Sequence, residues 1–553
     1  MAYNGEIYNY LELRRELEGL GASFRTDGDT EVLLAAWAQW QTQCLPKLNG
    51  MFAFAVFDSR DQTLTLARDR HGMKPLYFSI ENDSFLFASE PQVVAEMAGR
   101  VAPNHQKVYE YLTMGLYDLD DQTFFDGVHA LKPGFAATIQ VSDKRPEVSS
   151  ARWFAKQDVD PIEIELERAV EEVRLRFLES VSVHLRSDVP LAVGLSGGLD
   201  SSGIVGAIRY LQPGREIHTF SYGSPGFSKD ESGWSALVSK TLHTKHHHVG
   251  VSADELDERL KTVVREQGEP TNSSSVIAQS TLYRAARESG FKVLLDGQGA
   301  DELFAGYSGF IEFRIRSLLV EGKLWEATRL LSRWRGWSPQ HSAFQAAVSL
   351  GATYATGTIA GYGAGLVGRG AFPSWINLKE LYRRGVLPGV PSSIVGYPVG
   401  QAPGGYFLSQ HLGQSLFGGD LQRLLRHGDR SSMAHSVESR LPYLGKELVD
   451  FARSLPEDLL LSSHGEPKYL LRRVLSNLVP EVVVRRRDKI GFETPETIWR
   501  EKMWISRESF DSTLSHFNWI RLGQLYSKAS AKAADALGWR VRNLCAWSEE
   551  FLR

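Results

Sequence analysis

The stretch Leu195-Ser196-Gly197-Gly198-Leu199-Asp200-Ser201-Ser202 decides the fold of this chain. An apolar run from Pro190 to Leu195 precedes it and predicts a buried strand. A run of small and apolar residues from Gly203 to Leu211 follows it and predicts a helix. Between the two, glycines let backbone N–H groups close around an anion, and the first turn of the helix adds a partial positive charge. The stretch therefore predicts a loop that holds phosphate oxygens.

The details of this loop separate it from other nucleotide-binding motifs. It has neither the lysine of a Walker-type loop nor the third glycine of a dinucleotide fingerprint. Its Ser-Gly-Gly-x-Asp-Ser pattern resembles the pyrophosphate loop of the ATP pyrophosphatases, enzymes that cut ATP between the α- and β-phosphates. The alternative interpretation is a tight strand–helix turn that binds nothing.

The composition is that of a globular protein, 42% hydrophobic and 23% charged over 553 residues. That length predicts roughly two to four domains. The formal net charge of −4 disfavours a general nucleic-acid binder. No apolar run approaches the roughly 18 residues that span a bilayer. Two cysteines, Cys44 and Cys545, make no disulfide framework or Cys-rich metal site. Their scarcity, with no apolar signal core at the N-terminus, fits a cytoplasmic protein.

Residues 1–145 are expected to form a first domain of mixed helices and strands. Residues 12–20 have helical spacing, and Asp29-Thr30-Glu31 caps a second helix that runs to about Trp40. Strand-like runs at 51–58, 62–67, 75–79 and 84–88 predict hairpins of an antiparallel sheet. The polar residues 146–160 predict a linker.

Residues 161–553 are expected to form a second domain, which opens with a long amphipathic helix at 162–185. Strands and helices then alternate as far as Tyr307, with strands at 190–195, 216–222, 246–249 and 292–295. This order predicts a parallel, doubly wound sheet that binds ligands at the carboxyl ends of its strands. The sequence from about residue 310 to residue 500 predicts mostly helices. The irregular, glycine-rich residues 351–405 have no predicted structure and are a candidate substrate-specificity segment.

Two smaller patterns allow a structural as well as a functional interpretation. Glu269-Pro270-Thr271-Asn272-Ser273-Ser274-Ser275 offers hydroxyl groups to a ligand, although a helix cap explains one of its serines. His246-His247-His248 alternate between the two faces of a predicted strand. No carboxylate or cysteine partner for them is evident, so metal binding is not expected there.

Motifs in chain order show that the sequence resembles the glutamine-dependent asparagine synthetase family. In the first domain they are NGEIYN at 4–9, TDGDTE at 26–31, LNGMFAF at 48–54 and RDRHGMKPLY at 68–77. In the second they are the opening loop, TFSYG at 219–223, GQGADE at 297–302 and MAHSVESRLP at 433–442. The resemblance implies an Ntn-type αββα glutaminase domain, incomplete at its N-terminus. It also implies a doubly wound ATP-pyrophosphatase domain with a helical C-terminal part.

The resemblance implies a two-step reaction, in which a carboxylate attacks the α-phosphorus of ATP and ammonia then displaces AMP from the acyl-adenylate. Magnesium is expected with the triphosphate. Asp200 and Asp301 match the family's magnesium-binding aspartates, and Lys468 matches a lysine that neutralises the departing pyrophosphate. By its charge alone, Lys468 would be interpreted as a solvated helix residue. The residues that match the ATP-binding positions are Leu195, Ser196, Gly197, Gly198, Asp200, Ser201, Ser202, Tyr222, Asp296 and Gly297.

The loop Asp296-Gly297-Gln298-Gly299-Ala300-Asp301-Glu302 departs from the usual family pattern, Ser-Gly-Glu-Gly-Ser/Gly-Asp-Glu. The family's glutamate assists the second step, and Gln298 stands in its place as a candidate catalytic residue. An amide hydrogen-bonds but cannot take up a proton at neutral pH. Asp296 adds a charge where a small hydroxyl is usual. Either the chemistry is unchanged, or the substrate carboxylate or amine differs.

The glutaminase half lacks its expected nucleophile. Class II amidotransferases attack glutamine with an N-terminal cysteine, whose own α-amine serves as base. This chain begins Met1-Ala2, and Cys44 is internal. Asn4, Gly5, Glu6 and Asp29 match the residues that stabilise the oxyanion and hold the glutamine. We therefore expect no glutamine hydrolysis by the chain as numbered. Either the natural start lies upstream or the chain is a true truncation.

Three functions remain open at this point. The first is an amide-forming ligase that acts on aspartate or a related acid with ammonia or glutamine. The second is an intramolecular cyclase or a tailoring amidotransferase of the same superfamily. The third is a non-catalytic scaffold, against which the complete phosphate loop argues. Expected partners are small molecules rather than nucleic acid or membrane. The oligomeric state stays open, with a homodimer as the candidate.

Overall fold

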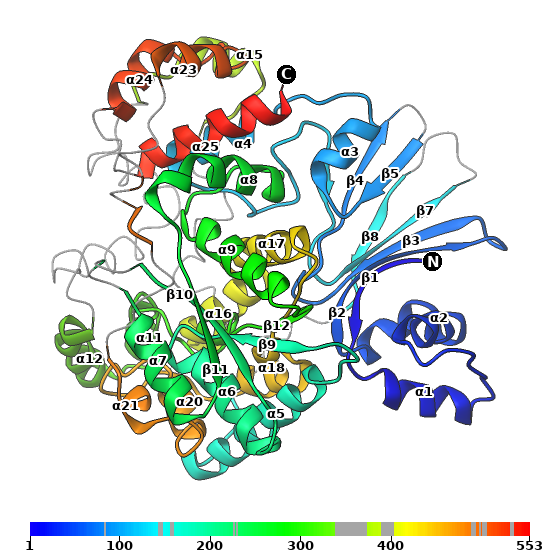
Figure 1. Ribbon diagram of the computed structural model, residues 1–553, viewed down its shortest axis with the longest axis vertical. Helices are drawn as coiled ribbons and strands as arrows, with labels where there is room; N and C mark the ends of the chain where they lie inside the picture. The colour runs from blue at the N-terminus through cyan, green and yellow to red at the C-terminus, as the bar shows by residue number, and fades with distance from the viewer. Residues whose placement is uncertain are drawn as a thin grey trace.

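The computed structural model describes residues 1–81, 84–141, 147–154, 160–224, 227, 230–337, 373–388, 403–487, 494–496, 499, 506–530 and 536–552. An antiparallel part built from the N-terminal residues lies beside a parallel sheet at the centre of the molecule (Figure 1). Within the described ranges, no helix combines the length and the apolar character needed to cross a membrane.

The N-terminal part contains two antiparallel sheets. The first has the order β1 (Ala2–Ile7), β2 (Gly50–Asp58), β3 (Thr63–Arg68), β7 (Phe135–Gln140) and β8 (Ser149–Arg152). The second has the order β5 (Ser84–Ala88), β4 (Tyr77–Glu81) and β6 (His129–Ala130). Helices α1 (Tyr10–Gly19) and α2 (Asp29–Trp40) cover the outer face of the first sheet, and α3 (Pro91–Met97) packs on the second (Figure 1).

The alternation of side chains along β2 explains this layering. Phe52, Phe54 and Val56 point to one face, where they share a core with Leu13, Leu33 and other residues of α1 and α2. Ala53 and Ala55 point to the opposite face, where their small side chains leave room for the second sheet. Successive strand residues face opposite sides, so one strand serves two cores. The four layers confirm the predicted αββα architecture.

Two expectations for this part need correction. The segment expected to be a linker contains strand β8, whose polar residues pair with β7 at the edge of the sheet. The residues of this strand do not alternate between apolar and polar, so the sequence gave no signal for it. Asp29 does not cap α2, whose N-cap residue is Gly28. The Asp29 carboxylate instead accepts hydrogen bonds from the Tyr3 hydroxyl (2.7 Å) and the Ile7 backbone N–H (2.9 Å).

The second part is a five-stranded sheet in which every neighbouring pair is parallel. Its strand order is β11 (Lys245–Val249), β10 (His218–Tyr222), β9 (Leu191–Gly194), β12 (Val293–Leu295) and β13 (Glu438–Arg440). The first helices around it are α5 (Leu166–His184), α6 (Leu199–Leu211), α7 (Ser232–Thr241), α8 (Leu256–Gln267), α9 (Ser275–Glu288) and α10 (Ala300–Leu303). The doubly wound parallel sheet is confirmed.

Strand β13 was not predicted. Glu438-Ser439-Arg440 is a short polar run far along the chain, and it becomes a strand only by pairing with β12, where Glu438 lies opposite Val293.

The remaining helices are α4 (His105–Met114), α11 (Phe310–Val320), α12 (Leu324–Trp337), α15 (Leu378–Arg383), α16 (Phe407–Phe417), α17 (Gly419–Ala434), α18 (Lys446–Arg453), α19 (Glu457–Leu460), α20 (Tyr469–Val474), α21 (Glu481–Val484), α23 (Arg507–Thr513), α24 (Leu522–Ser530) and α25 (Ala536–Phe551), with 3-10 turns η1 (Gln41–Lys47), η2 (Ala253–Glu255), η4 (Pro403–Gly405) and η5 (Pro442–Leu444). Most of the glycine-rich residues 351–405 lie outside the described residues.

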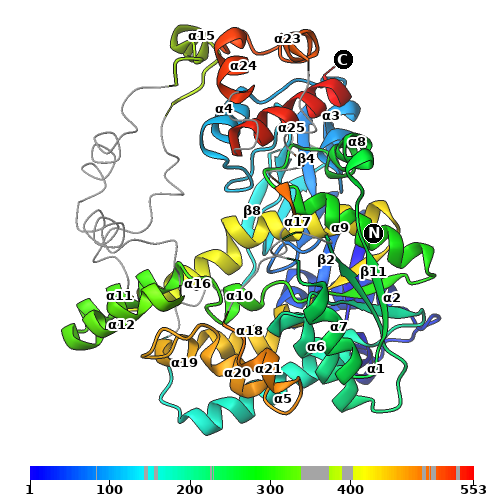
Figure 2. The same ribbon diagram turned by 60° about the vertical axis from the view of Figure 1, so that its left-hand side comes forward.

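The C-terminal helix α25 packs against α4 of the N-terminal half and against α8 (Figure 2). Trp547, which is fully buried, places its ring 5.8 Å from Phe124 and 5.3 Å from Phe125. Its indole N–H donates to the Gly268 carbonyl at 3.0 Å. One core therefore combines residues from both ends of the chain.

A buried interface joins the two halves near the sheets. Lys74 donates to Asp429 at 2.9 Å, and both side chains are almost completely buried. The Tyr8 ring lies 4.0 Å from the His184 ring, and both residues are buried. Because a buried charge without a partner is costly, these contacts fix the orientation of the halves.

Candidate active site at the ends of the parallel strands

The predicted phosphate loop connects β9 to α6. Gly197 has a left-handed backbone with a φ of 79°, and a Cβ on it would lie 2.5 Å from the backbone N of Ser235. The Ser196 hydroxyl accepts from the Gly198 N–H at 3.2 Å, and the Ser201 hydroxyl accepts from the Ser196 N–H at 3.2 Å. These hydrogen bonds hold the loop in front of the first turn of α6, where the helix dipole favours an anion.

A cavity of about 350 Å³ opens in front of this loop, at the carboxyl ends of β9, β10 and β12. Gly197 and Ser202 lie behind its wall, because Gly197 packs against Ser235 and the Ser202 side chain is fully buried. The cavity brings together all the other residues predicted for the synthetase half, namely Leu195, Ser196, Gly198, Asp200, Ser201, Tyr222, Asp296, Gly297, Gln298, Asp301 and Lys468.

Lys468 joins the two predicted magnesium ligands. Its Nζ lies 2.5 Å from Asp200 Oδ2 and 2.7 Å from Asp301 Oδ1. Burial opposes the charge of Lys468, but the two carboxylates outweigh it and raise the pKa of the ammonium group. Lys468 precedes α20 with a φ of 55°, a conformation that costs a non-glycine residue on the order of 1 kcal/mol. A Cβ on Gly306 would overlap Asp301 and Lys468, so only glycine fits beside the pair.

Asp296 and Gln298, the two positions that depart from the family pattern, face the same cavity. Asp296 directly follows β12, and its carboxylate accepts from the Gln298 side-chain amide at 3.4 Å. Burial raises the pKa of Asp296 to about 6, while the backbone N–H groups of Gly297 and Gln298 stabilise the carboxylate. The cavity thus contains a carboxyl group whose pKa burial raises above the ordinary range of aspartic acid.

Several residues of this wall were not predicted from the sequence. The Tyr307 hydroxyl donates to Glu302 at 2.7 Å, and burial, with Asp301 nearby, raises the pKa of Tyr307. Arg486 pairs with Glu231 at 2.9 Å and lies over the Trp234 ring. Glu302 belongs to the quoted loop motif and could have been found. Arg486 lies in a run of three arginines, which by itself suggests only an exposed charged surface.

The predicted glutamine-binding residues lie around β1. Asn4, Gly5 and Glu6 belong to this strand, and a Cβ on Gly5 would overlap the Met51 carbonyl of β2. Asp29 hydrogen-bonds to Ile7 at the end of the strand. Burial raises the pKa of Glu6 to about 7, assisted by Glu438 and opposed by Arg440, whose guanidinium lies 3.5 Å away. Glu6 therefore faces the synthetase half.

The two cysteines of this chain are unsuited to nucleophilic attack. Cys44 and Cys545 are both buried, and burial raises the pKa of each thiol to about 12. A thiol attacks as the thiolate, which neither side chain forms near neutral pH.

The remaining sequence patterns have local partners. His246 hydrogen-bonds with the Thr219 hydroxyl at 2.9 Å, and the His247 ring stacks on Phe220 at 4.5 Å. Ser274 is the N-cap residue of α9, but its side chain makes no capping hydrogen bond, and its hydroxyl contacts Thr494 and Glu496 instead. The described part of the chain contains no group of three His, Cys, Asp or Glu residues arranged to hold a metal.

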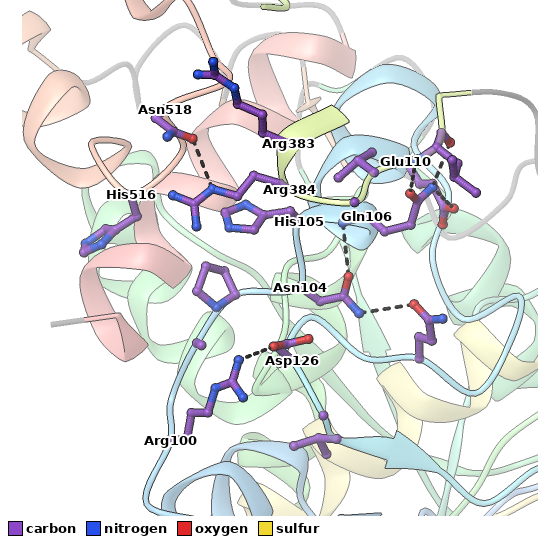
Figure 3. Close-up of a pocket in the computed structure, with 18 of the residues that line it drawn as sticks. Arg100, Asn104, His105, Gln106, Glu110, Asp126, Arg383, Arg384, His516 and Asn518 are labelled. Atoms are coloured by element: carbon purple, nitrogen blue, oxygen red, sulfur yellow. Dashed lines mark hydrogen bonds and ion pairs between the residues drawn. The ribbon is translucent and has the colours of Figure 1, made fainter. Parts of the chain in front are cut away.

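A larger cavity of about 1420 Å³ lies apart from this site, between α4, the residues after α15 and residues 515–518 (Figure 3). Arg384 donates to Asn518 at 3.4 Å across one wall, and Arg100 pairs with Asp126 at 2.6 Å on another (Figure 3). None of the site residues predicted from the sequence lines it. Size alone does not mark the active site.

Comparison with known proteins agrees with this geometry. The family model described as asparagine synthase matches residues 172–548, and the model described as glutamine amidotransferase domain matches residues 1–153. The chain belongs to the asparagine synthase family, and it is a carbon–nitrogen ligase.

Curated relatives match along most of the chain. "Asparagine synthetase [glutamine-hydrolyzing] 1" of Bacillus subtilis (strain 168) is 31% identical over 90% of this chain and 76% of the relative. "Asparagine synthetase [glutamine-hydrolyzing] 3" of the same organism is 28% identical over 88% and 74%. "Amidase chyE" of Penicillium rubens is 26% identical over 97% and 84%. Relatives with different names thus match along most of this chain.

Proposed function

We propose that this protein joins ammonia to a carboxylic acid in two ATP-dependent steps at the cavity in front of the phosphate loop. The carboxylate attacks the α-phosphorus of ATP and forms an acyl-adenylate, with release of pyrophosphate. Ammonia then attacks the acyl carbon, and AMP leaves. The observation that carries the proposal is the contact of Lys468 with both Asp200 and Asp301 beside a loop built for phosphate oxygens.

Each part of the cavity has a role in the first step. The N–H groups of the loop and the hydroxyls of Ser196 and Ser201 bind the phosphates, and Lys468 neutralises the pyrophosphate as it departs. The carboxylates of Asp200 and Asp301 both contact the ammonium group of Lys468, so they lie close together. Two such carboxylates, together with the phosphates of ATP, are oxygen ligands of the kind that magnesium prefers. When bound there, magnesium would neutralise charge on the triphosphate.

The acid is proposed to be aspartate or a related carboxylate, because relatives named asparagine synthetases match over most of the chain. The departures at Asp296 and Gln298 leave room for a different acid, as does the relative named an amidase. We propose that Asn4, Gly5, Glu6 and Asp29 bind glutamine. Because both cysteines of this chain are buried, the test uses ammonium as the nitrogen source.

The experiment measures pyrophosphate and AMP when the chain is incubated with ATP, magnesium chloride, ammonium chloride and a panel of acids that begins with aspartate. We expect equal amounts of pyrophosphate, AMP and amide, formed only with a particular acid. AMP release from one acid without ammonium would indicate cyclisation instead. ADP and phosphate as products, or no turnover with any acid, would contradict the proposal.

A further inference from the structure

We propose that the Asp296 carboxylate is the catalytic base of the second step, which accepts a proton from the attacking ammonia while Gln298 holds that carboxylate in place. The inference rests on the proposed function and assigns a residue to the step for which Gln298 itself cannot take up a proton. It follows from how the acidic side chains of the cavity are paired.

Five carboxylates line the cavity, and four of them are committed to other groups. Asp200 and Asp301 pair with Lys468. Glu231 pairs with Arg486 at 2.9 Å, and Glu302 accepts the Tyr307 hydroxyl at 2.7 Å. A carboxylate held by a cation or a hydroxyl is a weak base, because the partner stabilises the charged form.

Asp296 is the fifth carboxylate, and its surroundings differ. Among the described residues no cation pairs with it, and its partners are the neutral N–H groups of Gly297 and Gln298 and the Gln298 side chain. It directly follows β12, so the sheet fixes its backbone, which donates to the Arg440 carbonyl at 2.9 Å. Gln298 donates to Oδ2 at 3.4 Å, and Asp296 belongs to the wall of the cavity.

A single base is enough for the attack of ammonia on the acyl-adenylate. The nitrogen lone pair of ammonia forms the C–N bond, and the carbonyl electron pair moves onto oxygen. Asp296 takes one N–H proton and becomes the neutral acid. The carbonyl then re-forms, and the bond from the acyl carbon to the phosphate oxygen breaks with its electron pair leaving on AMP. Asp296 finally returns the proton to solvent or to the departing AMP.

The test separates the two steps in the full chain, with the acid that gives acid-dependent pyrophosphate release. Asp296→Asn keeps the shape and one acceptor oxygen but removes the base. Because Asp296 also matches an ATP-binding position, acid-dependent exchange of labelled pyrophosphate into ATP will fall as well, but we expect it to fall at least tenfold less than amide formation. Amide formation from ammonium should fall by about 100-fold, the lower range for general-base catalysis. Asp296→Ser is the second variant and should behave in the same way.

Two readouts distinguish a base from a structural residue. Hydroxylamine is a stronger nucleophile whose adduct loses its proton to water readily, so the Asp296→Asn variant should be impaired less than tenfold with it. The double variant Asp296→Asn/Gln298→Glu restores a carboxylate two residues away, and we expect it to recover at least tenfold of the lost ammonium-dependent rate. A merely structural defect would reduce both nucleophiles equally and would not be rescued.

The possible results separate failure of this inference from failure of the proposed function. If both Asp296 variants lose pyrophosphate exchange to the same extent as amide formation, Asp296 serves ATP binding and the inference is wrong. It is also wrong if amide formation from ammonium is unchanged. If the unaltered chain shows no acid-dependent pyrophosphate release, the proposed function itself has failed, and the base assignment fails with it.

Discussion

Lys468 shows how much of the site depends on single residues. By sequence it is a lysine before a short helix, and only its place in a motif marked it as functional. In the structure it is buried, has left-handed backbone dihedrals and contacts two carboxylates. Its partners lie more than 160 positions away in the chain, at roughly the ends of two parallel strands, which no local pattern predicts. Arg486 was missed for the same reason.

Replacing Lys468 should impair formation of the acyl-adenylate, the first step of the proposed reaction, more than the later attack by ammonia. We expect Lys468→Met to lower acid-dependent pyrophosphate release by at least 100-fold, because the charge of the departing pyrophosphate loses its partner. Lys468→Arg is the matched control and should retain more activity, since it keeps the charge. Thermal denaturation of both variants checks folding. A Met variant within tenfold of the unaltered rate would contradict the assigned role.

Adjacent glycines of the phosphate loop provide a second residue-scale comparison. Gly197 has a positive φ and touches the backbone of Ser235, whereas Gly198 has a φ of −72° and only the Ser196 hydroxyl near its missing Cβ. We therefore expect Gly197→Ala to destabilise the protein by more than about 1 kcal/mol. Gly198→Ala should cost clearly less. Urea unfolding of both variants measures the difference, and equal midpoints would show that the backbone strain is unimportant.

At the scale of elements, the sequence predicted what its own apolar pattern determines. Strands β9 and β12 are largely buried apolar runs, and they lie within about two residues of their predicted bounds, as does the largely buried β10. Strands β8 and β13 were missed because they are polar and exist by pairing with a neighbour. The candidate site was predictable through motifs at strand ends. Which side chains of the site pair with one another could not be predicted from the sequence. This includes the finding that no cation among the described residues pairs with Asp296.

Helix α25 should contribute a large part of the stability of the core that it forms with Phe124 and Phe125. Trp547 is completely buried between both halves, and we expect Trp547→Ala to cost about 3–5 kcal/mol. Trp325 is 78% exposed on α12 and serves as the matched control, with an expected cost below about 0.5 kcal/mol. Urea midpoints compare the two. A similar cost for both would mean that α25 does not depend on this contact.

At the scale of the whole molecule, the buried interface between the halves excludes water from titratable groups. His184 meets Tyr8 across it, and His71 of the N-terminal half stacks on Phe417 of α16 at 5.1 Å. Burial lowers the pKa of each imidazole to about 3, and Arg70 adds to the effect at His71. Both side chains are therefore neutral in the folded protein over most of the pH range.

The interface should weaken in acid. Below about pH 6.5 the unfolded chain takes up protons at these histidines while the folded protein does not, so stability falls as pH falls from about 6.5 toward 3. At pH 5 each histidine should cost about 2 kcal/mol relative to pH 7. His184→Gln stays neutral and should show a shallower loss by that amount in urea unfolding at the two pH values. Equal slopes for the variant and the unaltered chain would contradict this account.

The contact between Trp547 and the N-terminal half also bears on how the protein is made. Phe124 and Phe125 leave the ribosome long before the helix that covers them. At roughly 5–20 residues per second, the intervening stretch of about 420 residues takes on the order of 20–80 s to synthesise. For that time the nascent chain carries an uncovered aromatic surface, which is a binding site for chaperones and a hazard for aggregation. The first half of the protein therefore completes its core only after helix α25 has been synthesised.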